Sequence, residues 1–151
     1  MKNPLRVDEM INPHVSVDCV VLGFDGEHLK VLLVKQTGHE ESGYYNNMKL
    51  PGSLIYNDED LDEAAQRVLY ELTGLNELHL IQFRAFGSKN RTNNPKDTKW
   101  LERFHQLNQK VERIVTITYL TMVKIDKKLT HLSDRYEACW TDIDALCPLA
   151  F

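Results

Sequence analysis

The sequence has no long apolar run. None of its 151 residues lies in a stretch that reaches the roughly 20 apolar residues needed to cross a bilayer, and the N-terminus lacks the apolar core of a secretory signal. It also has no excess of basic residues, because 18 Lys and Arg stand against 22 Asp and Glu. Domains that bind nucleic acid are usually strongly basic, so direct binding by this segment is disfavoured. We expect a cytoplasmic protein without a membrane partner.

Cysteine is scarce as well. Cys19, Cys139 and Cys147 are an odd number and do not have the spacing of a metal site. A disulfide framework and a zinc site are therefore both disfavoured, and we expect reduced thiols. There is no internal repeat and no low-complexity segment.

What is present is an ordinary globular composition, with 42% hydrophobic and 26% charged residues. The length fits one domain with a substantial core. We predict a single domain over residues 1–151, with an N-terminal arm over 1–14 and an insertion loop of low apolar content over 92–110.

Strand patterns lie on both sides of one predicted helix. β-Branched residues and period-2 alternation mark the strands, and Asp25-Gly26 marks a hairpin turn between the first two. Glycines and polar residues from Thr37 to Asn47 predict a loop. The predicted strands are Val15–Phe24, Leu29–Lys35, Leu78–Gly87, Val111–Ile125 and Glu137–Trp140.

The central run extends from Leu50 to Leu75, beginning as a loop and ending as a helix. Asp60 and Glu63 have the spacing of a capping box, in which each side chain satisfies a backbone N–H at the helix start. Apolar residues recur at helical spacing after Asp60, and Gly74 is a natural C-terminal stop.

This run resembles the Nudix box, which reads Gly, five residues, Glu, seven residues, Arg-Glu-apolar-any-Glu-Glu-any-Gly-apolar. Ser53 takes the Gly position, and Glu59, Arg67, Glu71 and Gly74 match the pattern at the right spacing. The resemblance implies the Nudix fold, of class α/β (α+β), with a mixed β-sheet sandwiched between helices. It also implies descent from enzymes that cleave a nucleoside diphosphate linked to another group.

The metal positions of the box depart from the family pattern. An active box has three carboxylates at i, i+3 and i+4 of the helix, which lie on one face and converge on metal ions. Those positions are Val68, Glu71 and Leu72 here, so only Glu71 and the carbonyl of Gly52 remain for a weak site that we expect to be vacant. Magnesium clusters that activate water need more oxygen ligands than this.

Two interpretations of Val68 and Leu72 remain open: a lost metal site, or a widened apolar stripe on the buried side of the helix. Both imply that the metal site has gone. We therefore expect no catalytic residue, and we regard Glu59, Arg67 and Glu71 as vestigial. Glu59 and Arg67 are predicted to form an ion pair that fixes the loop onto the helix.

Further sequence features indicate one group within the Nudix family. The box, the loop carrying Phe86, Gly87 and Arg91, and the strand from Val111 to Tyr119 are similar to the Nudix-like sensor domains of bacterial transcriptional regulators, which include regulators of NAD synthesis and of arabinose use. The resemblance implies a homodimer that binds ADP-ribose or a sugar without hydrolysing it. In those regulators a winged-helix domain follows at the C-terminus. Since this chain has no basic helix-turn-helix stretch, it would reach DNA only through such a domain.

The resemblance places the ligand in the former active-site cleft and implies no required cofactor. Lys35 is equally compatible with an exposed lysine at a strand end. The predicted ligand-binding residues are Lys35, Gly52, Glu71, Arg91 and Arg113.

Two other functions remain open. One is an active, magnesium-dependent Nudix hydrolase whose ligand set is completed by Glu102 or Glu112. The other is a purely structural dimerisation module, which would show neither binding nor turnover. The chain stops on apolar residues, Leu149 to Phe151, as expected for a cut at a domain edge.

Overall fold

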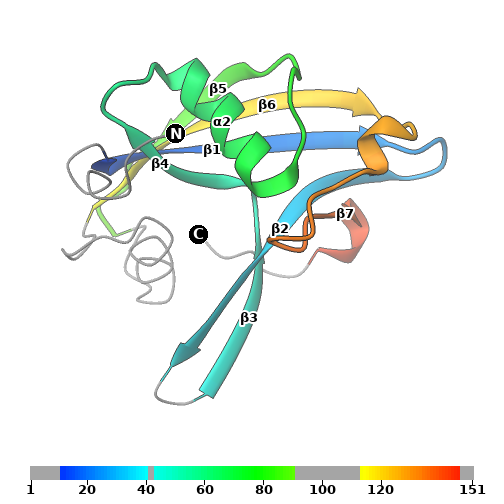
Figure 1. Ribbon diagram of the computed structural model, residues 1–151, viewed down its shortest axis with the longest axis horizontal. Coiled ribbons are helices and arrows are strands. Elements are labelled where there is room, and N and C mark those ends of the chain that lie inside the picture. The colour runs from blue at the N-terminus through cyan, green and yellow to red at the C-terminus, as the bar shows by residue number, and fades with distance from the viewer. Residues whose placement is uncertain (1–10, 41–42, 91–112, 147–151) are drawn as a thin grey trace.

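The computed structural model of the protein describes residues 11–40, 43–90 and 113–146. Within these ranges the chain forms a seven-stranded sheet, one α-helix and two short 3-10 helices (Figure 1). The elements are β1 (Ile11–Phe24), β2 (Leu29–Glu40), β3 (Gly43–Lys49), β4 (Gly52–Tyr56), α2 (Leu61–Thr73), β5 (Ile81–Phe86), β6 (Val115–Lys124), η2 (Lys128–Thr130), β7 (Cys139–Asp142) and η3 (Ile143–Ala145).

The sheet is mixed, as predicted. Its main order is β3-β2-β1-β6-β5, with β4 paired to β1 and β7 paired to β2. The β1–β6 pair is parallel from Val15↔Val115 to Phe24↔Lys124, and all other pairs are antiparallel. Strand β1 lies in the middle of this sheet, which explains why Val17, Cys19 and Val21 are completely buried.

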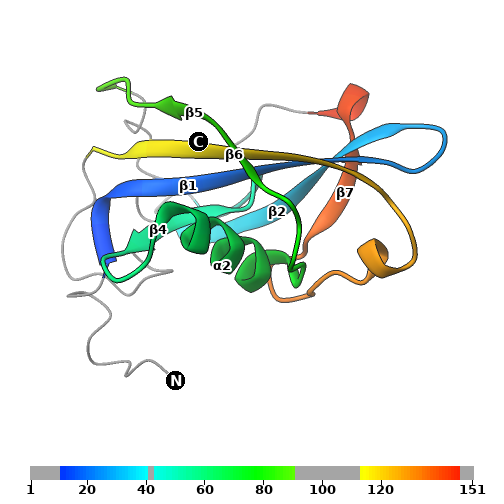
Figure 2. The ribbon, with the colours of Figure 1, turned by 90° about the horizontal axis from the view of Figure 1, so that it is seen from above.

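Helix α2 begins and ends where its capping residues predict. Glu63 accepts a hydrogen bond from the backbone N–H of Asp60 at 3.2 Å, and the capping box is present. At the other end Gly74 has φ 80°, a left-handed conformation that favours glycine, and its N–H donates to the carbonyl of Tyr70 at 2.8 Å. Figures 1 and 2 show α2 lying across β1 and β4, and its apolar face supplies much of the core.

Two boundaries were predicted wrongly. Strand β1 begins at Ile11, so residues 11–14 belong to the sheet and not to an arm. The loop predicted from Thr37 to Asn47 is a hairpin instead, with β2 and β3 paired from Val34↔Lys49 to Glu40↔Gly43. The residues there are polar and lack apolar alternation, but a strand ladder is held by backbone groups and does not require it. This hairpin projects from the rest of the sheet (Figure 1).

The other predicted strands are confirmed, β5 and β6 with shorter limits and β7 shifted by two residues towards the C-terminus. The insertion over 92–110 and residues 1–10 and 147–151 lie outside the described residues. Within the described ranges α2 is the only α-helix, so the second helical layer of the expected sandwich is not among them. No helix of the described residues is long and apolar enough to span a membrane.

Candidate functional site

The predicted ion pair between Glu59 and Arg67 is present. Arg67 Nη2 lies 2.7 Å from Glu59 Oε1 and Arg67 Nε lies 2.9 Å from Glu59 Oε2, a bidentate arrangement. The side chain of Glu59 is only 8% exposed and that of Arg67 only 16%. Glu59 Oε1 also accepts the backbone N–H of Tyr56 at 2.8 Å. The pair therefore fixes the loop before α2 to the body of the helix.

Arg67 has further partners on every side. It donates to the carbonyl of Leu54 at 3.1 Å and to Glu71 at 3.0 Å, and its guanidinium lies 4.2 Å from the centroid of the Tyr56 ring. Burial opposes the charge of Arg67, but hydrogen bonds and the nearby carboxylate of Glu59 more than compensate and raise its pKa. A guanidinium held in this way has a structural role and is not presented to a ligand.

The three positions of the box that carry carboxylates in active enzymes fall into two environments. Val68 and Leu72 are completely buried and belong to the core cluster, whereas the side chain of Glu71 is 40% exposed. The structure thus supports the interpretation that Val68 and Leu72 widen the apolar stripe. Among the residues that the structure describes, no group of three His, Cys, Asp or Glu side chains could hold a metal ion. These residues do not fit a magnesium cluster.

Gly52 lies where only glycine fits. A Cβ atom at this position would lie 1.8 Å from Oδ1 of Asp18 and 2.9 Å from the carbonyl oxygen of Val17. The preceding residue, Pro51, accepts the N–H of Cys19 at 2.8 Å, so the turn is fastened to β1. Its position against the buried strand β1 makes this turn a rigid part of the site.

The carbonyl oxygen of Gly52 accepts a hydrogen bond from Nζ of Lys49 at 3.0 Å. Lys49 is only 3% exposed. No sequence pattern assigned a role to this lysine. The available signal was its place immediately before the Leu-Pro-Gly turn, where a long polar side chain can reach the carbonyl groups of that turn.

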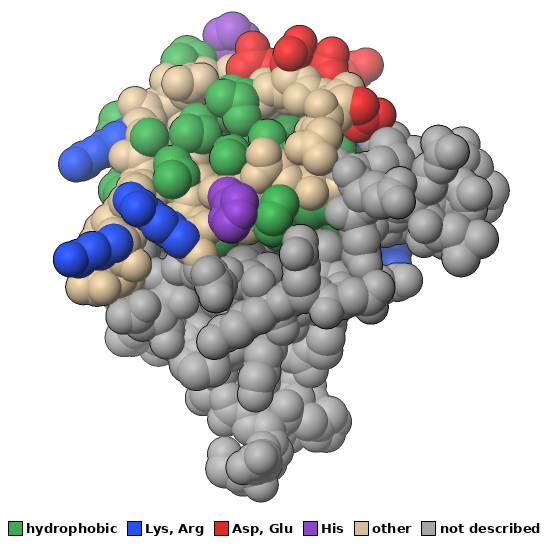
Figure 3. All heavy atoms as spheres, turned by 90° about the vertical axis from the view of Figure 1, so that its left-hand side faces the viewer, with side chains coloured by type: hydrophobic (Ala, Val, Ile, Leu, Met, Phe, Trp, Pro, Cys, Tyr) green, Lys and Arg blue, Asp and Glu red, His purple; other side chains and the backbone are tan. Residues whose placement is uncertain are grey.

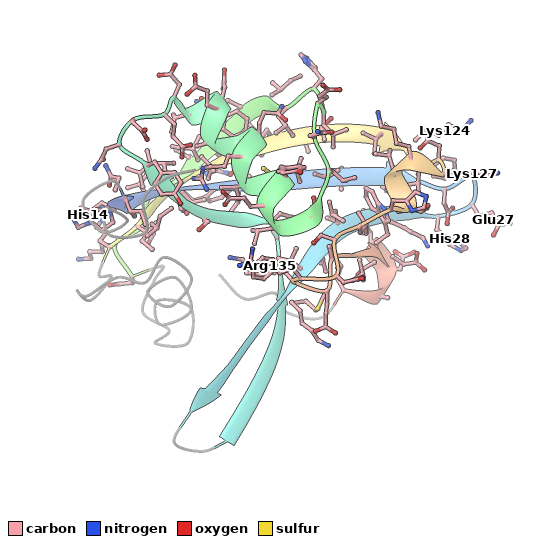
Figure 4. All side chains as sticks on the ribbon, in the orientation of Figure 1. His14, Glu27, His28, Lys124, Lys127 and Arg135 are labelled. Carbon is pink, nitrogen blue, oxygen red and sulfur yellow. The ribbon has the colours of Figure 1, made fainter. Side chains whose placement is uncertain are left out.

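The remaining predicted ligand contacts lie apart. Nζ of Lys35 is 3.3 Å from both carboxylate oxygens of Glu137. Nη2 of Arg113 donates to the carbonyl of Gly87 at 3.0 Å, and the carbonyl of Arg113 lies 3.1 Å from Nδ1 of His14, at one end of β1 (Figure 4). The contacts of Lys35 and Arg113 thus involve different partners and different parts of the sheet. Arg91, Glu102 and Glu112 lie outside the described residues.

A second group of side chains gathers beside Glu71. The carbonyl of Tyr136 accepts the N–H of Lys35 at 2.8 Å, and the guanidinium of Arg135 lies 5.4 Å from the Tyr136 ring centroid. Burial raises the pKa of Tyr136, the charge of Arg135 opposes this shift, and the carboxylate of Glu71 adds a smaller increase. Figure 4 shows Arg135 beneath α2, next to β2. No sequence pattern pointed to Arg135 and Tyr136, which reach this place only through the tertiary fold.

Charge is unevenly distributed around α2. The loop and first helical turn are rich in acid, and Figure 3 shows acidic side chains gathered along one edge of the face it presents, apart from the Lys and Arg side chains. An anionic ligand would be repelled from that edge and would approach the side of Arg135 and Lys35. The acidic residues in this run are Asp58, Glu59, Asp60, Asp62 and Glu63.

Two surface pockets lined by described residues lie elsewhere. One, of about 340 Å³, is lined by residues 74–78 and by Asp126, Lys128, Leu129 and His131. The other, of about 270 Å³, is apolar and lies on β5 and β6 around Ile81 and Met122. Neither is lined by Glu71 or Gly52, so geometry and chemistry point to different places. The apolar pocket also lacks the polar contacts that a charged ligand needs.

Comparison with known proteins identifies the class. The chain matches the NUDIX domain family over residues 12–151, and it belongs to that family. The mixed sheet with α2 on one face is consistent with the Nudix fold. A search of curated proteins found no match.

Among solved structures, the chain is similar to a MutT/nudix family protein from Enterococcus faecalis, with 25% identity and a TM-score of 0.63 over 87% of this chain and 44% of that one. It is similar to the NUDIX domain of Shewanella oneidensis NrtR complexed with ADP ribose, with 22% identity and a TM-score of 0.64 over 100% of this chain and 91% of that one. NrtR from the same organism complexed with a 27mer DNA shows 25% identity and a TM-score of 0.62 over 91% of this chain and 55% of that one. This chain thus spans about half the length of the longer relatives.

Proposed function

We propose that this Nudix domain binds a nucleotide of the ADP-ribose type, or a related sugar, as the effector-sensing domain of a transcriptional regulator, and that it no longer hydrolyses its ligand. The observation that carries the proposal is the complete burial of Val68 and Leu72, two apolar side chains at two of the three positions where active boxes carry carboxylates. Binding remains available to such a domain when hydrolysis does not.

The oxygens that remain near the box are already engaged. Glu71 is paired with Arg67, and the carbonyl of Gly52 accepts from Lys49. A magnesium ion would have to share each of them with a cation of the protein, and it would still lack the near-octahedral set of oxygen ligands that it requires. Without bound metal, the site has no means to lower the pKa of water or to neutralise a leaving diphosphate.

The ligand side of the proposal is supported by the charges beside α2 and by the relatives. Arg135 offers a cationic group beside the ring of Tyr136, and Lys35 offers a second one, which is paired with Glu137. A NUDIX domain of similar fold was solved with ADP ribose, and the longer NrtR chain was solved with DNA. In the proposed regulator the ligand shifts a homodimer between two states, which requires different affinities for the two. DNA would be contacted by a further C-terminal domain.

Calorimetry with ADP-ribose, in EDTA and then in magnesium, tests the proposal. We expect equal affinity in both and no turnover of ADP-ribose with magnesium or manganese. Arg135→Ala should weaken binding, whereas Lys30→Met should not, because Lys30 pairs with Asp25 and Asp142 elsewhere on the sheet. Binding seen only with a divalent ion, or turnover that is lost in Glu71→Gln, would favour the hydrolase instead. If the chain shows neither binding nor turnover of ADP-ribose, the structural dimerisation module is the remaining function.

A further inference from the structure

Both oxygen groups left for a metal ion in this box are engaged by cations of the protein itself. Nζ of Lys49 lies 3.0 Å from the carbonyl oxygen of Gly52, and Nη1 of Arg67 lies 3.0 Å from Glu71 Oε2. Arg67 is explained by its bidentate pair with Glu59. Lys49 precedes the box, whose pattern does not specify a residue at this position.

The burial of Lys49 makes its presence costly. Its side chain is 3% exposed, and an ammonium removed from water destabilises the fold unless polar partners compensate. The carbonyl of Gly52 is one such partner, and the carboxylate of Asp18 lies against the same glycine. An uncharged side chain of similar length would fill this space without the cost of desolvation. The ammonium thus lies at the carbonyl oxygen that the box offers to a metal ion.

We propose that Lys49 is a built-in cation that replaces a divalent ion at the carbonyl of Gly52, and that its charge lets the site attract the diphosphate of an anionic ligand without metal. The second half of this inference rests on the proposed function, whereas the first half does not. A charge surrounded by protein acts more strongly than one in water, so an ammonium can attract phosphate oxygens without direct exposure. Unlike a bound magnesium ion, the ammonium of Lys49 is present at any magnesium concentration.

The ligand half is tested by calorimetry with ADP-ribose in EDTA. Lys49→Met keeps most of the side-chain volume and removes the charge, and Lys30→Met is the matched control at a lysine outside the site. We expect Lys49→Met to bind ADP-ribose at least about tenfold more weakly, because it loses an interaction with a charged group. Lys30→Met should bind ADP-ribose like the unaltered chain. Thermal unfolding verifies that each variant folds. Equal affinity in Lys49→Met would overturn the proposal.

The metal half is tested without any nucleotide, by titrating manganese into two variants and following its electron paramagnetic resonance signal. One carries Val68→Glu and Leu72→Glu, and the other carries Lys49→Met in addition. If Lys49 occupies the place of the ion, removing it should tighten manganese binding at least about tenfold, because the ammonium repels the ion and competes for Gly52. Equal binding in the two variants would overturn this half.

Val68 and Leu72 are completely buried, so the paired glutamates could prevent folding. In that case the same comparison is made with Leu72→Glu alone, with and without Lys49→Met. The two halves fail separately. If the unaltered chain binds no ADP-ribose, the proposed function is wrong, and the manganese comparison still decides whether Lys49 takes the place of a metal ion.

Discussion

Arg67 on α2 holds the carboxylate of Glu59 with two of its nitrogens, at 2.7 Å and 2.9 Å, while a third nitrogen lies 3.0 Å from Glu71. Two acidic residues of the box are thus joined through one guanidinium. The pair with Glu59 is mostly buried and the pair with Glu71 is more exposed, so the two should differ in their effect on stability.

The buried pair should contribute strongly. Glu59→Gln leaves the buried charge of Arg67 without its main partner, and we expect the free energy of unfolding to fall by about 3 kcal/mol. Urea denaturation followed by circular dichroism measures this change.

The matched control is Glu71→Gln, which removes the other carboxylate on the same guanidinium. Because Glu71 is 40% exposed and its pair is screened by solvent, we expect a loss within about 1 kcal/mol. Equal losses in the two variants would show that Glu59 does not fix the loop.

Gly52→Ala should destabilise the turn that precedes β4. The added Cβ would lie 1.8 Å from Asp18 Oδ1, a distance that forces the backbone or the carboxylate to move, and we expect a loss of about 2 kcal/mol. Gly87→Ala is the control, because the nearest atom to its Cβ is in Val115 at 3.6 Å, and the change should stay within about 0.5 kcal/mol.

A double-mutant cycle with Asp18→Ala identifies the clash. In that background Gly52→Ala should lower the free energy of unfolding by a smaller amount. Some loss should remain, because the carbonyl of Val17 would still lie 2.9 Å from the added atom. If the cost of Gly52→Ala is the same in both backgrounds, the carboxylate of Asp18 is not the obstacle.

Sequence patterns predicted the parts of this site that depend on local chemistry. The limits of α2 follow from Asp60, Glu63 and Gly74, which act within one helical turn of their own position. The pair between Glu59 and Arg67 follows from the spacing of the box. The position of Val68 and Leu72 in the core follows from helical periodicity.

The residues that were missed depend on contacts between distant segments. Arg135 and Tyr136 come beside Glu71 only because the chain after β6 returns along β2 and the end of α2, where the N–H of Ser133 donates to the carbonyl of Thr73. The hairpin of β2 and β3 was missed because its ladder joins polar residues, and pattern analysis detects apolar alternation rather than backbone pairing.

The thiol of Cys19 should make the protein sensitive to alkali. Burial raises the pKa of Cys19 well above its ordinary value, and the neighbouring charge of Asp18 adds to the effect. The unfolded chain loses this proton near its ordinary pKa of 9.0 while the folded chain keeps it. Stability is therefore full below pH 9 and should fall by about 1.4 kcal/mol per pH unit above it.

Urea denaturation between pH 8 and pH 11 measures this slope, and Cys19→Ala should remove the part that begins near pH 9. Burial and the carboxylate of Asp62 raise the pKa of Tyr119 as well, so a second decrease should begin near pH 10 and disappear in Tyr119→Phe. An unchanged slope in Cys19→Ala would mean that the thiol is not protected by the fold.

Asp25 in the turn between β1 and β2 should titrate unusually low. Its Oδ1 accepts the backbone N–H groups of His28 at 2.8 Å and of Glu27 at 2.9 Å, and Lys30 lies 3.3 Å from its other oxygen. Hydrogen bonds from His28 and Glu27, followed by Lys30, lower the pKa of Asp25 to about 2.

A carboxyl group with a lowered pKa contributes stability above its ordinary pKa of 3.8 and loses it as the pH falls towards 2. An NMR titration of the Asp25 side-chain carboxyl carbon measures the pKa directly. Because the backbone bonds are the main cause, Lys30→Met should raise it only slightly. A return to the ordinary value in Lys30→Met would show instead that the lysine, and not the turn, holds the charge.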